Sequence, residues 1–342
     1  MMKFSKGAFL LFLLLAIPVS AQVSLKGTGS SLAAPLLDQW IAAYLHVHPE
    51  VKLRYEAKSS ADGIAQCLGK GAELGVTDTP MSVAEEKKAN NRVILHLPAA
   101  IEAVVLTYNL PGIPTGLQIS PKALSGLFMG TIKKWNDPAL AECNPGVKLP
   151  NVDVLVVHRE EESSLHDLFP SYLSQLDPKW TLKREKDKNL HWPVGQNLKG
   201  NSKIFEKMRL WPGVIAAVDH SYAVQNHLPM AKLRNRAGHY VAPSAESLTA
   251  AAADFPQLPD DLQVNLEKSN GEGAYPLCSL AWLLVYQDLY KSFHDHKRGG
   301  ALSQFLNWAY VDGQKSVEEA GFVPLPAAFL SQAQEKLKTL QY

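Results

Sequence analysis

The sequence predicts an α/β fold made of two lobes that share a cleft. Strand-like apolar runs alternate along the chain with segments of helical periodicity, a pattern typical of largely parallel sheets covered by helices. Two strongly apolar runs, residues 103–108 and 280–286, bracket a middle block of the chain. We therefore expect the chain to leave a first lobe, build a second lobe and return, with both strands crossing between them. Ligands of such lobes bind at the carboxyl ends of the strands, which places the expected site between the lobes.

The start of the chain has the pattern of a secretory signal peptide. Lys3 and Lys6 precede an apolar run at residues 8–17, and small residues follow up to Ala21. The run is shorter than the roughly 20 apolar residues that a spanning helix needs, which argues against a membrane anchor. We expect cleavage after Ala21 and no lipid attachment, because no cysteine follows the apolar run.

The expected division of the chain follows from this leader and from the two crossing strands. Residues 1–21 form the signal peptide. Residues 22–107 together with residues 280–342 form the first lobe, and residues 108–279 form the second lobe.

The expected strands are short runs rich in valine, leucine and isoleucine that end at polar or glycine-containing turns. In chain order they are residues 23–26, 51–55, 73–77, 103–108, 152–157, 213–218 and 280–286. The third of these ends in Asp78, because Pro80 prevents its continuation.

The expected helices show apolar residues at three- and four-residue spacing. They are residues 32–45, 64–68 and 120–128, a segment that begins near Leu165, residues 303–310 and the C-terminus. Ser30 or Ser31 is the expected N-cap of the first helix. Turns or loops are expected at residues 27–31, 58–63, 130–138, 192–195 and 199–201, and a surface connection at residues 243–259.

Charge and cysteine content limit the function classes. The chain holds 34 Lys and Arg against 33 Asp and Glu, so it lacks the field that would attract nucleic acid or an anionic membrane. Cys67, Cys143 and Cys278 are an odd number. Either two of them form a disulfide and one stays free, or all three are buried as small hydrophobic residues, and their spacing matches no metal site.

Three polar turns each precede a helix-like segment, at residues 28–31, 59–63 and 163–165. A single turn of this kind is ordinarily an N-cap. Three of them, together with Asp78 at a strand end and Arg159, predict that hydroxyls and helix N-terminal amides converge on an oxyanion. Arginine offers a rigid fork of donors for such a group. A carboxylate such as Asp78 would select an anion that still carries a proton.

Signatures of enzymes are weak. The glycine turn at residues 27–29 lacks the third glycine of a dinucleotide loop, and the sequence has neither a GxxxxGK[ST] nor a GxSxG motif. Ser163, His166 and Asp167 are neighbours in sequence only. His158 beside residues 160–162, which are all glutamate, could suggest a metal, but a solvated acidic loop is the preferred interpretation. We expect neither an enzyme nor a cofactor.

Two stretches are distinctive motifs: residues 130–138 (Gly-Thr-Ile-Lys-Lys-Trp-Asn-Asp-Pro) and residues 144–150 (Asn-Pro-Gly-Val-Lys-Leu-Pro). They are similar to the G-x-I-x-x-W-x-D-P and N-P-G-x-x-L-P of the periplasmic phosphate-binding proteins of phosphate ABC importers, the PstS family, which the chain resembles over nearly its whole length. Further similar stretches are residues 27–35, 78–82, 192–195 and 199–201. The resemblance implies a two-lobed type II periplasmic binding fold with two hinge-crossing strands.

The resemblance also implies roles for individual residues. Ser31 and the amide of Leu32 would contact phosphate, Ser60 would stand at the second turn, and Asp78 would accept the phosphate proton. Arg159 would bind the anion, with Glu161 in the place of an aspartate that pairs with that arginine. Ser163 stands at the serine of the family's Gly-Ser-Gly-Thr helix start, followed by the amides of Ser164 and Leu165.

Departures from the family pattern fall on the same loops. Residues 162–165 read Glu-Ser-Ser-Leu, so that Glu162 replaces a glycine and Leu165 cannot supply the threonine hydroxyl. In the second turn, Ala61 and Asp62 replace Ser-Gly. The binding loop is therefore divergent in part.

The function implied is an exported protein that captures inorganic phosphate between its lobes and delivers it to the membrane permease subunits of an ABC importer. We expect a monomer in the periplasm. One alternative is the same fold with another oxyanion, or a scaffold or sensor in which Glu162 takes the anion's place beside Arg159. The other is a secreted metal-dependent phosphatase that uses His158 or His166.

Overall fold

The computed structural model describes residues 22–160, 165–176 and 192–342, without the side chains of residues 165–167. Within these residues, an eight-stranded mixed sheet has the strand order β2-β1-β3-β11-β4-β8-β6-β7, and a small sheet has the order β10-β9-β5. The strands are β1 (Val23–Ser30), β2 (Val51–Lys58), β3 (Leu74–Thr77), β4 (Ile94–Tyr108), β5 (Gln118–Ile119), β6 (Leu155–Arg159), β7 (Gln196–Leu198), β8 (Val214–Asp219), β9 (Lys232–Arg234), β10 (Tyr240–Val241) and β11 (Cys278–Tyr286).

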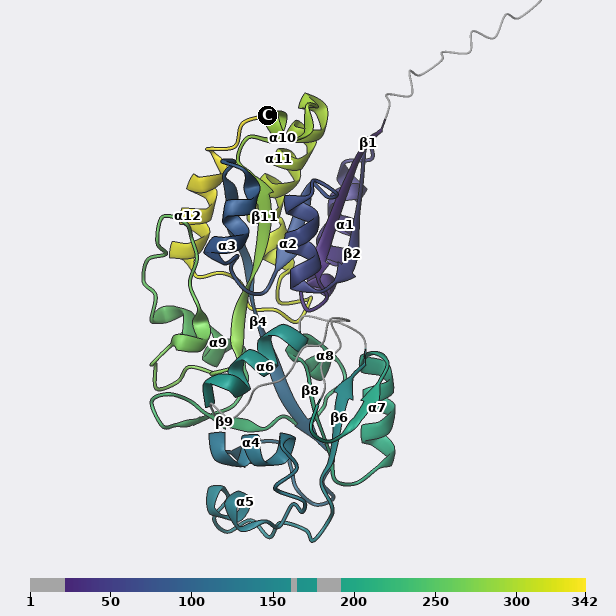
Figure 1. The fold of residues 1–342 in the computed structure, drawn as a ribbon, viewed down its shortest axis with the longest axis vertical. Coiled ribbons are helices and arrows are strands. Elements are labelled where there is room, and N and C mark those ends of the chain that lie inside the picture. Colours follow the sequence, from purple (N-terminus) through teal and green to yellow (C-terminus); the bar gives the residue numbers. More distant parts are fainter. Residues whose placement is uncertain (1–21, 161–164, 177–191) are drawn as a thin grey trace, which may run out of the picture.

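Helices pack against this sheet in its upper and lower parts (Figure 1). The α-helices are α1 (Ala34–Val47), α2 (Ser60–Leu68), α3 (Val83–Glu86), α4 (Pro121–Phe128), α5 (Pro138–Cys143), α6 (Leu165–Leu176), α7 (Gly200–Leu210), α8 (His220–Gln225), α9 (Ala245–Ala253), α10 (Leu289–Phe293), α11 (His296–Val311) and α12 (Ala327–Leu337). Short 3₁₀ turns are η1 (Lys87–Ala89), η2 (Leu266–Lys268) and η3 (Gly313–Ser316).

Two lobes are visible in Figure 1, and the predicted α/β fold is confirmed. The upper lobe carries β1, β2 and β3 with α1, α2, α10, α11 and α12, and the lower lobe carries β6 and β8 with α4, α6, α7 and α8. The strand β4 runs from one lobe into the other, and β11 pairs with it along Cys278–Tyr286. The first half of β4 therefore belongs to the upper part of the sheet, and its last residues, from Val104 to Tyr108, pair with β8 in the lower part.

The predicted parallel pairing of strands is found on either side of β4 and β11, but not at these two strands themselves. The strand β1 is parallel to β2 and β3, and β6 is parallel to β7 and β8. The two crossing strands are antiparallel to each other and to their neighbours β3 and β8. The carboxyl ends of the parallel strands in each lobe therefore lie at one edge of that part of the sheet.

The first strand is longer than expected. Residues 27–30, predicted as a turn, continue β1 up to Ser30. Close contact with the neighbouring strand β3 requires this stretch to contain glycine, because a Cβ on Gly29, whose φ is +136°, would lie 2.0 Å from the carbonyl oxygen of Val76. The expected N-cap is also corrected, since α1 begins at Ala34 with Ala33 as its cap residue. Ser30 contributes less directly, because its Oγ accepts from the Ala33 amide at 3.0 Å.

The crossing strand β4 also extends beyond the predicted residues 103–108 and begins at Ile94. His96, Pro98 and Glu102 interrupt the apolar run of its first half, although the strand is buried from Leu95 onward. Hydropathy alone could not place these residues in a central strand.

The expectation of a surface connection at residues 243–259 was wrong in part, because it contains α9. Ser244 caps this helix, its side chain accepting from the Ser247 amide. Leu248 and Ala251 are fully buried, so the helix presents a core face made mostly of small residues, whose periodicity is weak.

All three cysteines are buried and free, which settles the two alternatives left by the sequence. In the described part of the chain, no helix is long and apolar enough to cross a membrane.

Candidate functional site

Three strands of the first lobe end side by side at the cleft. Ser30 of β1 is in register with Lys58 of β2, and Gly29 of β1 is in register with Val76 of β3. Ser31, Ser59 and Asp78 therefore follow neighbouring strand ends, as the alternation of strands and helices predicts. The structure brings two of the predicted turns and the predicted strand end at Asp78 together at one edge of the sheet.

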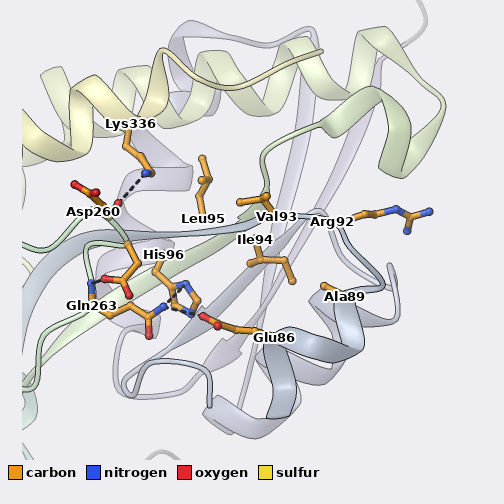
Figure 2. Close-up of a pocket in the computed structure, with 11 residues that line it drawn as sticks. Glu86, Ala89, Arg92, Val93, Ile94, Leu95, His96, Asp260, Gln263 and Lys336 are labelled. Atoms are coloured by element: carbon orange, nitrogen blue, oxygen red, sulfur yellow. Dashed lines mark hydrogen bonds between the residues drawn. The ribbon is translucent and has the colours of Figure 1, made fainter. Parts of the chain in front are cut away.

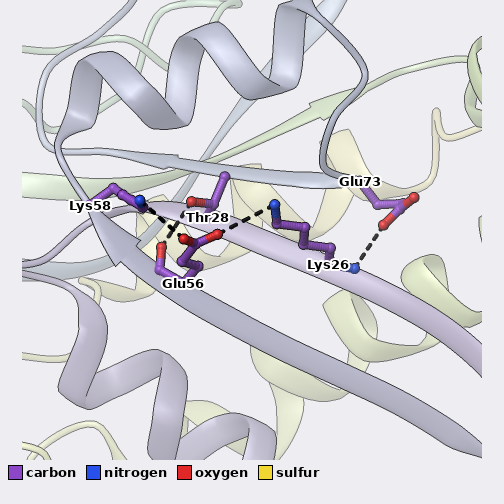
Figure 3. Close-up of polar contacts among 5 residues, drawn as sticks. All are labelled: Lys26, Thr28, Glu56, Lys58 and Glu73. Carbon is purple, nitrogen blue, oxygen red and sulfur yellow. Dashed lines mark hydrogen bonds and ion pairs between the residues drawn. The ribbon is translucent and has the colours of Figure 1, made fainter.

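The β1–β2 edge is held in register by polar contacts that surround the strand ends (Figure 3). Glu56 of β2 pairs with Lys26 at 3.4 Å and with Lys58 at 3.1 Å, and Thr28 donates to the Glu56 carbonyl oxygen at 2.8 Å. Lys26 also donates its amide hydrogen to the buried Glu73 at 2.7 Å. These contacts belong to the scaffold and fix the position from which Ser31 leaves the sheet.

Ser31 and Leu32 lie where β1 turns into α1. The Ser31 amide donates to the Lys58 carbonyl oxygen at 2.9 Å, and the Leu32 side chain is 2% exposed. Tyr55 donates its hydroxyl to the Ser30 carbonyl oxygen at 2.7 Å, which braces the same turn. Ser31 lines the cleft, whereas the role of the Leu32 amide stays a prediction.

The second turn begins α2 earlier than the sequence indicated. Ser59 is the N-cap, and its side chain accepts from the Asp62 amide at 3.1 Å. Ser60 is therefore the first residue of the helix rather than part of a loop. The Asp62 side chain, which departs from the family pattern, accepts a hydrogen bond from Ser59 Oγ at 2.9 Å.

Asp78 is completely buried at the end of β3, where the sequence placed it. Its Oδ2 accepts from Ser60 Oγ at 2.8 Å, its amide donates to the same Oγ at 3.0 Å, and its carbonyl oxygen accepts from Ser279 of β11. Among the described residues, Asp78 Oδ1 has no hydrogen-bond partner. A buried acceptor without a partner is costly, so this oxygen is suited to receive a proton from a ligand.

The second lobe contributes Arg159 and a carboxylate that the sequence analysis missed. Arg159 ends β6 and Asp219 ends the parallel strand β8, and Arg159 Nη1 lies 3.9 Å from Asp219 Oδ2. Asn201, in the first turn of α7, donates to the same Asp219 oxygen at 2.7 Å. The available signal was the polar residue directly after the apolar run at residues 213–218, the same rule that identified Asp78.

Both lobes line one cavity of about 250 Å³. Ser31 and Asp38 come from the first lobe, and Arg159, Asn201 and Asp219 come from the second. Two of the predicted site residues, Ser31 and Arg159, thus face the same space. Asp78 and Ser60 do not line this cavity and lie buried below the strand ends.

The loop between β6 and α6 carries the remaining predicted residues. Glu161, Glu162, Ser163 and Ser164 lie outside the described residues. Leu165 begins α6, which matches the predicted helix start, and the helix continues through Pro170.

His158, named in the phosphatase alternative, is a buried packing residue. Its ring stacks on Trp192 with 4.0 Å between centroids and 6° between planes, and its Nε2 donates to the Val194 carbonyl oxygen at 2.7 Å. In the part of the chain that the structure describes, no three His, Cys, Asp or Glu side chains are grouped to hold a metal.

A larger hollow of about 410 Å³ lies beside the start of β4 (Figure 2). Gln263 donates to Glu86 at 2.9 Å and contacts His96 at 3.3 Å, and Lys336 donates to the Asp260 carbonyl oxygen at 2.7 Å. Although Arg92 and Lys336 also line this hollow, it contains none of the predicted site residues. The smaller cavity between the lobes is the better candidate site.

The fold is that of a two-lobed binding protein, and both lobes line the cavity described above. A family model described as the PBP superfamily domain matches residues 17–312. The chain is 34% identical over 313 residues to the phosphate-binding protein PstS of Xylella fastidiosa strain Temecula1, covering 91% of this chain and 84% of that protein. It is 33% identical over 332 residues to the PstS of Pasteurella multocida, covering 96% and 94%. The protein belongs to the PstS family of phosphate-binding proteins.

A solved structure shares the fold at low sequence identity. It is a high-affinity periplasmic phosphate-binding protein (PfluDING) bound with phosphate, with a TM-score of 0.68 and 17% identity over 92% of this chain and 93% of that one. The two-lobed architecture is therefore that of this structural class.

Proposed function

We propose that this protein captures inorganic phosphate in the cleft between its lobes and delivers it to the membrane subunits of an ABC importer. The observation that supports the proposal is that Ser31 from one lobe and Arg159 from the other line one cavity, with the buried Ser60–Asp78 pair at the neighbouring strand end. Ser31, Ser60 and Asp78 come from one lobe and Arg159 from the other. The named function of the family's curated relatives, phosphate binding, agrees with this chemistry.

Phosphate fits this set better than a fully ionised anion. Arg159 supplies positive charge and forked donors. The Asp78 carboxylate accepts hydrogen bonds and repels an anion that has no proton to donate. Phosphate at neutral pH keeps at least one proton, whereas sulfate keeps none, so the site would prefer phosphate.

The proposed ligand contacts are the hydroxyls of Ser31 and Ser60, the amide of Leu32, the Asp78 carboxylate and the Arg159 guanidinium. On the segment between β6 and α6 we propose the Ser163 hydroxyl, the amides of Ser164 and Leu165, and Glu161 as a partner that orients Arg159.

Closure of the lobes would bury the anion. We propose residues 22–107 with 280–342 as one lobe and residues 108–279 as the other, moving about β4 and β11. β4 pairs with β11 along its first part and with β8 along its last residues, so small changes in its backbone angles would open or close the cleft.

The cellular setting is part of the same proposal. Export with cleavage after Ala21 would place the protein in the periplasm, where a monomer could meet the permease subunits. Capture and release need no covalent chemistry, so we propose a binding protein rather than an enzyme.

Isothermal titration calorimetry with phosphate, arsenate and sulfate tests the proposal. We expect saturable heat with phosphate and arsenate, which both carry protons, and much weaker binding of sulfate. A flat titration at millimolar phosphate would overturn the assigned ligand.

A second candidate is a scaffold or sensor of the same fold with weak phosphate binding. The observation that favours it is the grouping of carboxylates at the crossing, since Glu102 is close to both Asp78 and Asp219, and Arg159 pairs with Asp219. The Glu162→Gly/Leu165→Thr variant tests the hypothesis that Glu162 takes the place of the anion beside Arg159. It should bind phosphate more tightly than the wild type if Glu162 occludes the anion site.

A further inference from the structure

Glu102 lies at the point where the two lobes meet, and the sequence analysis assigned it no role. It stands in the middle of β4, opposite Ser279 of β11, and is 3% exposed. Two residues farther along β4, Val104 is opposite Asp219 at the end of β8. On the other side, Ser279 donates its hydroxyl to the Asp78 carbonyl oxygen. Glu102 is therefore placed between the two strand-end carboxylates of the proposed site.

The charged groups that act on Glu102 have the same sign as its own ionised form. They are Asp78, which follows β3, and Asp219, which ends β8. Asp78 and Glu102 also act electrostatically on the Tyr55 hydroxyl of β2. The positive charge of Arg159, on β6, is next to Asp219, with 3.9 Å between Arg159 Nη1 and Asp219 Oδ2. The ring of His220, which begins α8, is directed to the Gly321 carbonyl oxygen at 3.3 Å.

Among the described residues, neither carboxyl oxygen of Glu102 receives a hydrogen bond from a donor, and the Asp78 carboxyl group lies within hydrogen-bonding reach of it. An ionised carboxylate in this position would be buried, unpartnered and close to two other carboxylates, which is strongly unfavourable. Burial, and then the nearby Asp78 carboxylate, raises the pKa of Glu102 well above its usual range. The protonated form removes the repulsion and offers an O–H donor.

We propose that Glu102 is a further residue of the anion site, that it acts in its protonated form, and that phosphate binding is therefore coupled to retention of this proton. The inference rests on the proposed function, since phosphate is taken as the ligand. Two neighbouring carboxyl groups then have opposite tasks. Asp78 accepts a proton from the anion, and Glu102 donates its own hydrogen to an anionic oxygen.

A linkage follows from this assignment. An anion bound near Glu102 holds the proton on its carboxyl group more tightly than the empty site does. Affinity then falls as the pH rises through the range in which the empty protein loses that proton, by up to about tenfold per pH unit for one linked proton. The ionisation of phosphate itself adds a separate dependence that is the same for every variant.

The test is calorimetric titration of phosphate into wild type, Glu102→Gln and Glu267→Gln from pH 5 to pH 9. Glutamine keeps the shape and a donor but cannot titrate. Glu267 is a matched control, because it is another buried glutamate, 6% exposed, with one unpartnered oxygen, and lies outside the cleft. We expect Glu102→Gln to flatten the pH dependence relative to wild type, and Glu267→Gln to keep the wild-type dependence.

Equal pH dependence in wild type and Glu102→Gln would overturn the inference while leaving the proposed function intact. Failure of all three proteins to bind phosphate at every pH would overturn the proposed function itself. Infrared difference spectroscopy on the wild type gives an independent readout that does not need the variant to fold. We expect a protonated carboxyl C=O band that shifts on phosphate addition, and a band that does not respond would also overturn the inference.

Discussion

Ser60 holds Asp78 by two hydrogen bonds, donating from Oγ to Oδ2 at 2.8 Å and accepting from the Asp78 amide at 3.0 Å. The pair joins the first turn of α2 to the end of β3, eighteen residues later. It fixes the rotamer of Asp78 and leaves Oδ1 without a partner among the described residues. The carboxylate is thus oriented before any ligand arrives, which lowers the entropic cost of binding.

Replacement of Asp78 by asparagine tests this orientation. The amide keeps the size of the side chain but loses the charge and one acceptor. A hydrogen bond to a charged group is worth about 1.5–3 kcal/mol, so we expect phosphate affinity to fall about 10- to 100-fold. Sulfate should lose less or bind more tightly, because the repulsion is gone. Titration calorimetry with both anions measures the ratio.

The control for this variant is Asp153→Asn. Asp153 lies on the surface of the second lobe, with 84% of its side chain exposed, and should leave both affinities unchanged. An unaltered phosphate-to-sulfate ratio in Asp78→Asn would show that this carboxylate does not select for a protonated anion.

Arg159→Lys tests whether the site needs the fork of the guanidinium or only its charge. Lysine keeps the charge but offers a single ammonium group, so it can neither bind an anion with two parallel bonds nor reach Asp219 in the same geometry. We expect phosphate affinity to fall by about tenfold or more, and Arg159→Ala to lower it further. Competition binding against wild type measures both.

The exposed Arg236 provides the matched control, since Arg236→Lys changes the same chemistry away from the cleft. Wild-type affinity in Arg159→Lys would mean that the guanidinium does not contact the anion.

Sequence reasoning succeeded where one local rule applied. Asp78 and Arg159 were identified because each ends or directly follows an apolar run, and parallel strands place such residues at one edge. Asp219 obeys the same rule but was missed, because the order β4-β8-β6 could not be read from the chain. Strand ends can be predicted locally, whereas strand neighbours depend on packing between distant segments.

Glu102 shows more clearly what could not be predicted from the sequence. It interrupts a crossing strand whose predicted part began at the next residue, so its charge argued against burial. Its importance depends on Asp78, Asp219 and Ser279, which come from three other strands. The boundaries of β1 and α2 failed for a milder reason, because glycine and serine at residues 27–30 and 59–60 resemble a turn although contact with β3 makes them a strand end and a helix start.

Glu267 makes a prediction about stability and pH. It is 6% exposed in η2, its Oε2 accepts from Gln175 at 2.9 Å, and burial raises its pKa to about 7 from an ordinary 4.5. The folded protein thus keeps this proton at pH values where the unfolded chain has lost it. The contribution is complete below pH 4.5 and disappears as the pH rises through 7. Its full size is about 3 kcal/mol.

Urea unfolding of wild type and Glu267→Gln between pH 4.5 and pH 8 measures this contribution. The free energy of unfolding of the wild type should fall with pH relative to that of the variant. Glu206→Gln, at an exposed position paired with Lys203, should keep the wild-type slope. Parallel curves for wild type and Glu267→Gln would contradict the prediction.

Gly63→Ala tests the contact on which the first lobe's strand ends depend. A Cβ at this position of α2 would lie 2.2 Å from the Val76 carbonyl oxygen and 2.9 Å from the Gly29 Cα. Both are backbone atoms, so no side-chain rotation can relieve the overlap, and α2 must move away from β3. We expect a loss of about 1–3 kcal/mol in the free energy of unfolding, even though alanine is the better helix former by about 1 kcal/mol.

The same movement would displace Asp78, which follows Val76 by two residues, so phosphate affinity should fall together with the melting temperature. Gly273→Ala is the matched control, because the nearest atom to its new Cβ is Ala250 Cβ at 3.8 Å. Thermal unfolding and phosphate titration on both variants separate the two effects. If Gly63→Ala melts with the wild type and binds phosphate normally, the approach of α2 to β3 does not set the geometry of the Ser60–Asp78 pair.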